Sequence, residues 1–270
     1  MGLRKYIGVG ALVLASMASC VRGEENVDIN QPRVLEFDYK EDDKEKYIFK
    51  VKASFSVSGA VSGGANLELN GNLSSEVYRS TNESASLEFK VTRFKGNMRG
   101  KVKNEDVSYD LNWKEGDSRV DLPDGFDLEE SGRVIFERGG EIKSLSSSFG
   151  VSSRLDIFPD RPVKKGDSWE YNNDEGVYNF KLEGERECGG RKCFVISYSA
   201  KREGRDEESS ISGKGSGKIY YDPVGKGMVG FDVDCAAEQS ASVEIEDDNG
   251  DAKKKKITQK SKSSISLMKE

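Results

Sequence analysis

Side chains alternate between apolar and polar along most of this chain, and this period of two is the feature that most constrains the fold. From Tyr47 to Val57 the odd positions are apolar and the even positions mostly polar, as in a β-strand that buries one face. The alternation recurs at Leu87, Phe89 and Val91, at Val107, Tyr109, Leu111 and Trp113, at Tyr178, Phe180 and Leu182, and at Phe194, Ile196 and Tyr198. The sequence therefore predicts an all-β protein with very little helix, limited to a turn or two at residues 123–130.

The predicted strands are long, and long strands curl. A strand from Lys46 to Ser58 would extend for about 40 Å at about 3.3 Å per residue. Short glycine-rich and polar turns separate the strands, and short connections join antiparallel neighbours. We expect a long, curved antiparallel meander, either an open barrel or a bent two-sheet arrangement. Two strand-rich halves, about residues 33–113 and 155–269, form either two domains or two parts of one sheet system.

Composition and charge suit sheets with one face in water. Apolar residues make up 35% of the chain, charged residues make up 33%, and there are 29 glycines, as expected for sheets that are wet on one side. The net charge of −6 gives no general attraction to nucleic acid. The basic run 253–256 follows an acidic run across Asn249-Gly250, so we predict a hairpin in which the two runs pair.

The first twenty residues are typical of an export signal. Arg4 and Lys5 precede an apolar run at residues 7–15, which is too short for a bilayer span of roughly 20 residues. No transmembrane helix is expected in the chain. Met17-Ala18-Ser19-Cys20 resembles the lipobox of prokaryotic lipoproteins, although leucine is usual in place of Met17, and this resemblance implies a lipidated Cys20.

Lipidation at Cys20 would divide the chain into three parts. Residues 1–20 would be the signal peptide, residues 21–31 a polar tether, and residues 32–270 the β-rich domain, held at a membrane by the lipid. Ordinary cleavage after Ala18 or after Gly23 is the alternative, and it would release a secreted protein.

The most distinctive segment is FPDRPVKKGDSW, at residues 158–169. It resembles the F/L-P-x-x-P-V-x-x-G-D-x-W signature of uncharacterised bacterial envelope lipoproteins. These proteins share a domain of unknown function. The segment GKGSGKIYYDPVG, at residues 213–225, is similar to a G-x-G-x-x-Y/W-x-D-x-x-x-G strand and turn in the same group. Alternating glycines are typical of a strand that bends or that another backbone approaches closely. The resemblance implies an envelope location and a strand-rich fold, and it implies no established activity.

The residues of the first signature have structural explanations. Pro159 and Pro162 cannot donate to a ladder and keep the chain extended. Gly166 and Asp167 are expected to form a turn. Trp169 then begins the next strand on its buried face, where its indole N–H needs one acceptor.

Cys188 and Cys193 flank a Gly-Gly turn at residues 189–192, and an exported protein is expected to oxidise such a pair to a disulfide. The alternation places Cys188 on the buried phase and Cys193 on the polar phase, so the bond requires a bulge or a slipped hairpin tip. Cys235 shares the phase of its apolar neighbours and is expected to be a small buried residue, with an exposed reactive thiol as the alternative. Because the chain has no histidine, two thiolates would leave a metal site incomplete, and we expect neither metal nor other cofactor.

No catalytic constellation is recognisable. Without histidine the chain lacks Ser-His and Cys-His pairs, and none of its 48 acidic residues is distinguished by spacing. We predict a non-catalytic lipoprotein of the cell envelope, periplasmic or facing the cell surface, whose curved sheet binds a lipid, another apolar ligand or a protein partner. Two alternatives stay open, a small outer-membrane β-barrel and a carboxylate-based hydrolase.

Mass spectrometry of the mature N-terminus tests the predicted anchor. We expect the mature chain to begin at Cys20 and to carry the added mass of acyl groups. A mature chain that begins at Ser19 or at Glu24 would instead indicate ordinary cleavage and a secreted protein.

Overall fold

Thirteen β-strands form the regular structure of the residues that the computed structural model describes. These residues are 27–59, 62–102, 105–116, 131–144, 154–173, 176–205, 209–246 and 252–270. Within these ranges there are strands and no helix, so the all-β prediction is confirmed. The predicted signal peptide, Cys20 and the predicted helical turn at 123–130 lie outside the described residues.

The strands follow one another along the chain in an antiparallel meander. Their bounds are β1 (Lys44–Gly59), β2 (Gly63–Ser80), β3 (Ser84–Val102), β4 (Glu105–Lys114), β5 (Ser131–Glu137), β6 (Glu141–Ser144), β7 (Arg154–Asp156), β8 (Ser168–Asn173), β9 (Gly176–Cys188), β10 (Arg191–Arg205), β11 (Ser209–Asp222), β12 (Gly227–Glu246) and β13 (Ala252–Lys269).

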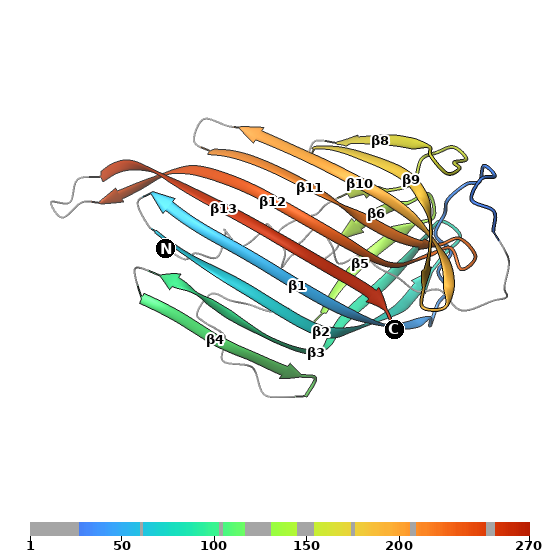
Figure 1. Ribbon diagram of the computed structural model, residues 1–270, viewed down its shortest axis with the longest axis horizontal. Coiled ribbons are helices and arrows are strands. Elements are labelled where there is room, and N and C mark those ends of the chain that lie inside the picture. The colour runs from blue at the N-terminus through green and yellow to red at the C-terminus, as the bar shows by residue number, and fades with distance from the viewer. Residues whose placement is uncertain are drawn as a thin grey trace.

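The two strand-rich halves belong to a single sheet. Its order is β7-β6-β5-β3-β2-β1-β13-β12-β11-β10-β9-β8, with β4 paired to β3 outside this path. The first strand pairs with the last from Tyr47 opposite Lys269 to Gly59 opposite Ile257. This ladder lies near the middle of the sheet, so it joins the two halves along most of their length (Figure 1).

The sheet curls into a nearly closed barrel. Besides its ladder with β2, strand β3 pairs with two different strands along its other edge. The first part of β3 pairs with β5 and its last part pairs with β4. Figure 1 shows β5 and β6 behind the long strands, where β3 has turned the sheet back on itself. The seam between β8 and the opposite edge has no backbone ladder. The expectation of an open barrel is therefore the one that the structure confirms.

Residues 27–43 cross one end of this barrel and fill it with aromatic side chains. The Phe37 ring packs against Phe136 at 5.0 Å and Phe158 at 4.7 Å between ring centroids. Its backbone N–H donates to the Arg138 carbonyl at 3.0 Å. We call this the closed end, and we call the end that carries the β1–β2, β10–β11 and β12–β13 turns the open end.

The packed part of the chain begins earlier than the predicted domain boundary at residue 32. Ile29 belongs to the core and is 6% exposed, and its carbonyl accepts a hydrogen bond from the Lys165 backbone at 2.9 Å. Residues 27–31 therefore pack against the domain.

The predicted hairpin near the C-terminus is present as β12 and β13. Glu244 lies opposite Lys254, whereas Ser242 lies opposite Lys256 and Glu246 lies opposite Ala252, so one acidic–basic pair is in register among the described residues. The tip with Asn249-Gly250 lies outside the described residues. Across the described ranges, no helix is long and apolar enough to cross a membrane.

Glycines on the inner side of β11 differ in how closely the next strand approaches them. A Cβ atom added at Gly217 would lie 2.1 Å from the Asp232 carbonyl oxygen, so only glycine fits without a backbone shift. At Gly213 the nearest atom would lie 3.7 Å away, which is an ordinary contact. The predicted close approach is therefore present at Gly217 and absent at Gly213.

This difference predicts opposite effects of two alanine substitutions. Gly217→Ala should lower the free energy of unfolding by about 1–3 kcal/mol, because the strands must separate to admit the methyl group. Gly213→Ala should leave it unchanged or raise it by about 0.4–1 kcal/mol, because alanine restricts the unfolded chain. Urea unfolding midpoints measure both effects, and equal midpoints for the two variants would contradict the assignment.

Candidate ligand-binding hollow

The inner face of the barrel is built by one phase of each strand. On β1, Tyr47 and Phe49 are buried in the core, and the same phase continues toward the open end through Val51, Ala53 and Phe55. Directly paired residues of neighbouring strands share a face, so the ladders extend this inner face across the sheet. The strand alternation therefore decides which side chains point into the barrel.

A row of small side chains crosses this inner face halfway to the open end. Each member lies directly opposite the next on the neighbouring strand. Ordered from β1 to β10, the row is Ala53, Ser263, Cys235, Gly215 and Ala200. We call these five residues the small-residue row.

Larger residues stand at both ends of the small-residue row. Ala53 pairs with Leu67, which pairs with Met98. At the other end, Ala200 pairs with Tyr178, which pairs with Tyr171. The row is thus the floor of a trough with tall side chains on either side.

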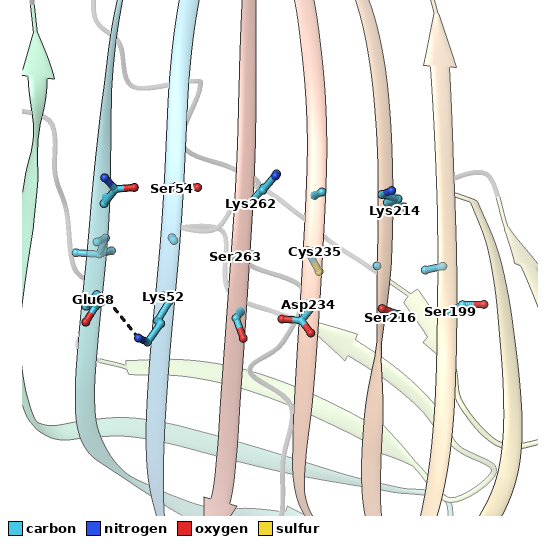
Figure 2. Close-up of a pocket in the computed structure, with 17 residues that line it drawn as sticks. Lys52, Ser54, Glu68, Ser199, Lys214, Ser216, Asp234, Cys235, Lys262 and Ser263 are labelled. Carbon is cyan, nitrogen blue, oxygen red and sulfur yellow. Dashed lines mark hydrogen bonds and ion pairs between the residues drawn. The ribbon is translucent and has the colours of Figure 1, made fainter.

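A hollow of about 770 Å³ lies at the small-residue row. It adjoins a second hollow of about 800 Å³ nearer the open end, which Phe55, Ala237 and Ser261 help to line. Figure 2 shows the residues around the first hollow, which come from six adjacent strands between β2 and β10. A third hollow, of about 590 Å³, lies beside Trp169, Phe180 and Tyr198.

The inner face changes from apolar to polar along the barrel. Val233 and Ile265, toward the closed end, are buried against the core. Beyond the small-residue row, Gln239 and Gln259 lie opposite each other near the open end. The lining therefore offers an apolar environment inside and amide groups at the open end.

The outer phase of the same strands is charged, and some of its residues, such as Lys52 and Glu68, also border the first hollow. Lys52 pairs with Glu68 at 3.3 Å, as Figure 2 shows, and Lys260 pairs with Glu238 at 3.2 Å. These side chains are about half exposed or more, so each pair contributes little to stability. Their position indicates that the outer face lies in water.

Cys235 lies in the small-residue row with a half-buried side chain. Burial raises the pKa of its thiol, and the neighbouring Asp234 carboxylate adds to this effect. At neutral pH the thiol is therefore protonated and a poor nucleophile. It contributes a small, weakly polar surface to the hollow.

Cys188 and Cys193 share the outer face of the β9–β10 hairpin. The register of the β9–β10 ladder shifts between Val195 and Ile196. Glu183 therefore has no residue opposite it on β10, and the phase of β9 is reversed toward the hairpin tip. This is the bulge that the cysteine spacing requires. Both thiols are buried in a small second core with Val195, Tyr220 and Val229. A hydrogen bond between them lowers the pKa of Cys188 and raises that of Cys193.

The signature at residues 158–169 holds the edge of the barrel together. Gly166 has a φ of 93°, and the Asp167 carboxylate accepts the Lys164 backbone N–H at 3.0 Å, which forms the turn. The Trp169 indole donates to the Ile157 carbonyl at 3.1 Å, across the seam between β8 and the segment after β7.

The remaining signature residues and the second motif also have structural positions. Pro159 and Pro162 lie between β7 and β8, outside any strand. Asp222 is buried at the β11–β12 turn, where its carboxylate accepts two backbone N–H groups at 2.9 Å and pairs with Arg191 at 2.8 Å. The first motif therefore lies apart from the small-residue row, whereas Gly215 of the second motif belongs to it.

The small-residue row was not anticipated from the sequence. Each strand contributes one or two small residues, and these become one feature only when the registers of five strands are known. A search for small residues on the buried phase of several strands could have found it. Among the described residues, no group of three or more histidine, cysteine, aspartate or glutamate residues could hold a metal ion.

Comparisons with known proteins include a likeness to a solved structure. No family model and no curated protein matches the chain. The fold is similar to part of a solved structure described as showing lipid–protein interactions in lipovitellin, with 14% sequence identity and a TM-score of 0.41. The match covers 86% of this chain and 25% of the other, so the protein spans about a quarter of that chain's length.

Cys188 and Cys193 are free thiols in the structure, and their shared face predicts that they form a disulfide under oxidising conditions. We expect the peptide that contains Cys188 and Cys193 to be lighter by two hydrogens before reduction than after it. Peptide mass spectrometry of alkylated protein measures this difference, with Cys235→Ser as a control that should not alter it. Alkylation of both cysteines without prior reduction would contradict the prediction.

Proposed function

We propose that the protein is a non-catalytic carrier that holds an apolar ligand, above all the acyl chain of a lipid, in the hollow of its curved sheet. The observation that supports this proposal is the small-residue row. Five adjacent strands each place a small side chain at the same level of the inner face. A structural barrel interior of this width would need large side chains there to fill it.

The size and lining of the hollow suit such a ligand. Its volume of about 770 Å³ falls in the range of about 300–1,000 Å³ that is usual for small-molecule sites. The inner-phase part of the lining combines methyl groups, glycine backbone, the Ser263 hydroxyl and a protonated thiol with Leu67, and outer-phase residues, among them Lys52, Glu68 and Asp234, complete it. Flexible hydrocarbon gains contacts along such a surface without requiring directional partners.

The charged outer face supports a carrier that is surrounded by water. Cross-strand ion pairs cover it, and lipid-facing strands would instead present apolar residues outward. We further propose that the lipid on Cys20 holds this carrier at a membrane of the cell envelope, where acyl lipids are available. The N-terminal resemblance to a lipobox supports that location.

A substitution that fills the hollow tests the proposal. Ala200→Leu should weaken binding of the neutral fluorophore N-phenylnaphthylamine at least about tenfold, because the larger side chain occupies the ligand volume. Fluorescence titration of the purified protein measures the dissociation constant. Urea unfolding of each variant checks that the fold is retained.

The matched control adds the same side chain on a strand that does not line the hollow. Ser108 on β4 is exposed and lines neither the first nor the second hollow, so Ser108→Leu adds a similar side chain without entering the ligand volume. We expect it to bind the fluorophore like the original protein. Equal weakening by both substitutions, or no binding by the original protein, would overturn the proposed function.

A further inference from the structure

The lining of the second hollow includes Arg202 from the inner phase, together with Lys201, Lys214, Lys260 and Lys262 from the outer phase. Arg202 follows Tyr198 and Ala200 on the inner phase of β10 and lies opposite Gly213 on β11. It helps to line the hollow that extends from the small-residue row toward the open end. Its guanidinium can therefore reach a ligand that lies in the trough.

The rest of the inner lining is neutral. Between the level of Phe49 and the level of Val57, Arg202 is the only charged residue on the inner phase of β1, β2 and β10 to β13, all of which are described over this stretch. The same strands carry many charges on their outer phase. A charged residue on an otherwise neutral inner lining is therefore an exception to the pattern of the sheet.

Arg202 does not serve the ion pairs of its own strand. Its neighbours Lys201 and Glu203 pair with each other at 2.8 Å, and both are on the outer phase. No carboxylate of the described residues forms an ion pair with Arg202. Its charge is thus available to a ligand.

The length of the apolar floor matches an extended chain with a polar end. On β12, about 20 Å separates the buried Val233 from Gln239, at about 3.3 Å per residue. Gln239 and Gln259 face each other at the level just beyond Arg202. A guanidinium offers paired donors that suit a carboxylate or a phosphate.

We propose that the ligand is an anionic acyl lipid, whose chain lies along the small-residue row and whose anionic group binds Arg202 at the open end. This inference rests on the proposed function and specifies its ligand class. The anionic group belongs to either a free fatty acid or an anionic phospholipid, because both combine an acyl chain with an oxyanion.

Paired probes that differ only in charge test the role of Arg202. The fluorescent cis-parinaric acid and its methyl ester have the same chain, and only the acid is an anion at neutral pH. The original protein should bind the acid about tenfold more tightly than the ester. Arg202→Gln should remove this preference and leave binding of the ester unchanged. Lys50→Gln, which changes an exposed outer-phase lysine of β1 that lines neither hollow, should leave both affinities unchanged.

Competition experiments distinguish the two sources of the lipid. Displacement of cis-parinaric acid by palmitate indicates a fatty acid, and displacement by phosphatidylglycerol vesicles indicates a membrane phospholipid. Either displacement supports the proposal if Arg202→Gln weakens it. Failure of both competitors would overturn it.

The results separate this inference from the proposed function. If the original protein binds the ester and the acid equally, or if Arg202→Gln retains the preference for the acid, the assignment of Arg202 fails and the carrier function stands. If neither probe binds, both the carrier function and its ligand class fail.

Discussion

The antiparallel ladder between β1 and β13 is the constraint on which the rest of the structure depends. It pairs the first strand of the described chain with the last, so the two meanders become one sheet instead of two small ones. Each meander alone would expose a long unpaired edge at that position. Because the ladder runs from the closed end to the open end, it also places strands of both halves beside each other around the hollow.

Curvature then determines where the sheet is packed and where it is hollow. At the closed end, residues 27–43 bring Phe37 between the turned-back strands and the main sheet, and aromatic rings fill the interior. Toward the open end the inner residues become small. The same alternation that builds a core at one end therefore leaves space at the other, because side-chain size changes while the phase is kept.

Charge and burial are separated by the two faces of each strand. The outer face carries lysine and glutamate in cross-strand pairs, which favour water without stabilising the fold greatly. The inner face is neutral along the hollow apart from Arg202. Arg202 is unusual because its inner-phase neighbours are neutral. An arginine among many charged residues would be an ordinary solvated side chain. The structural motifs at residues 158–169 and 213–225 hold turns and the seam, so they support the hollow without lining its centre, except for the glycines of β11.

The sequence by itself determined the all-β class, the long curved strands, the hairpin at β12–β13 and the need for a bulge or a slipped tip in the hairpin that carries Cys188 and Cys193. These features depend on side-chain periods and on turns, which are local properties of the chain. Only the tertiary structure decided that β1 pairs with β13, that residues 27–31 pack against the domain, and that Ala53, Cys235 and Ala200 lie in one row. Those outcomes depend on register between strands that are far apart in the sequence, and a shift of one residue would turn each side chain to the other face.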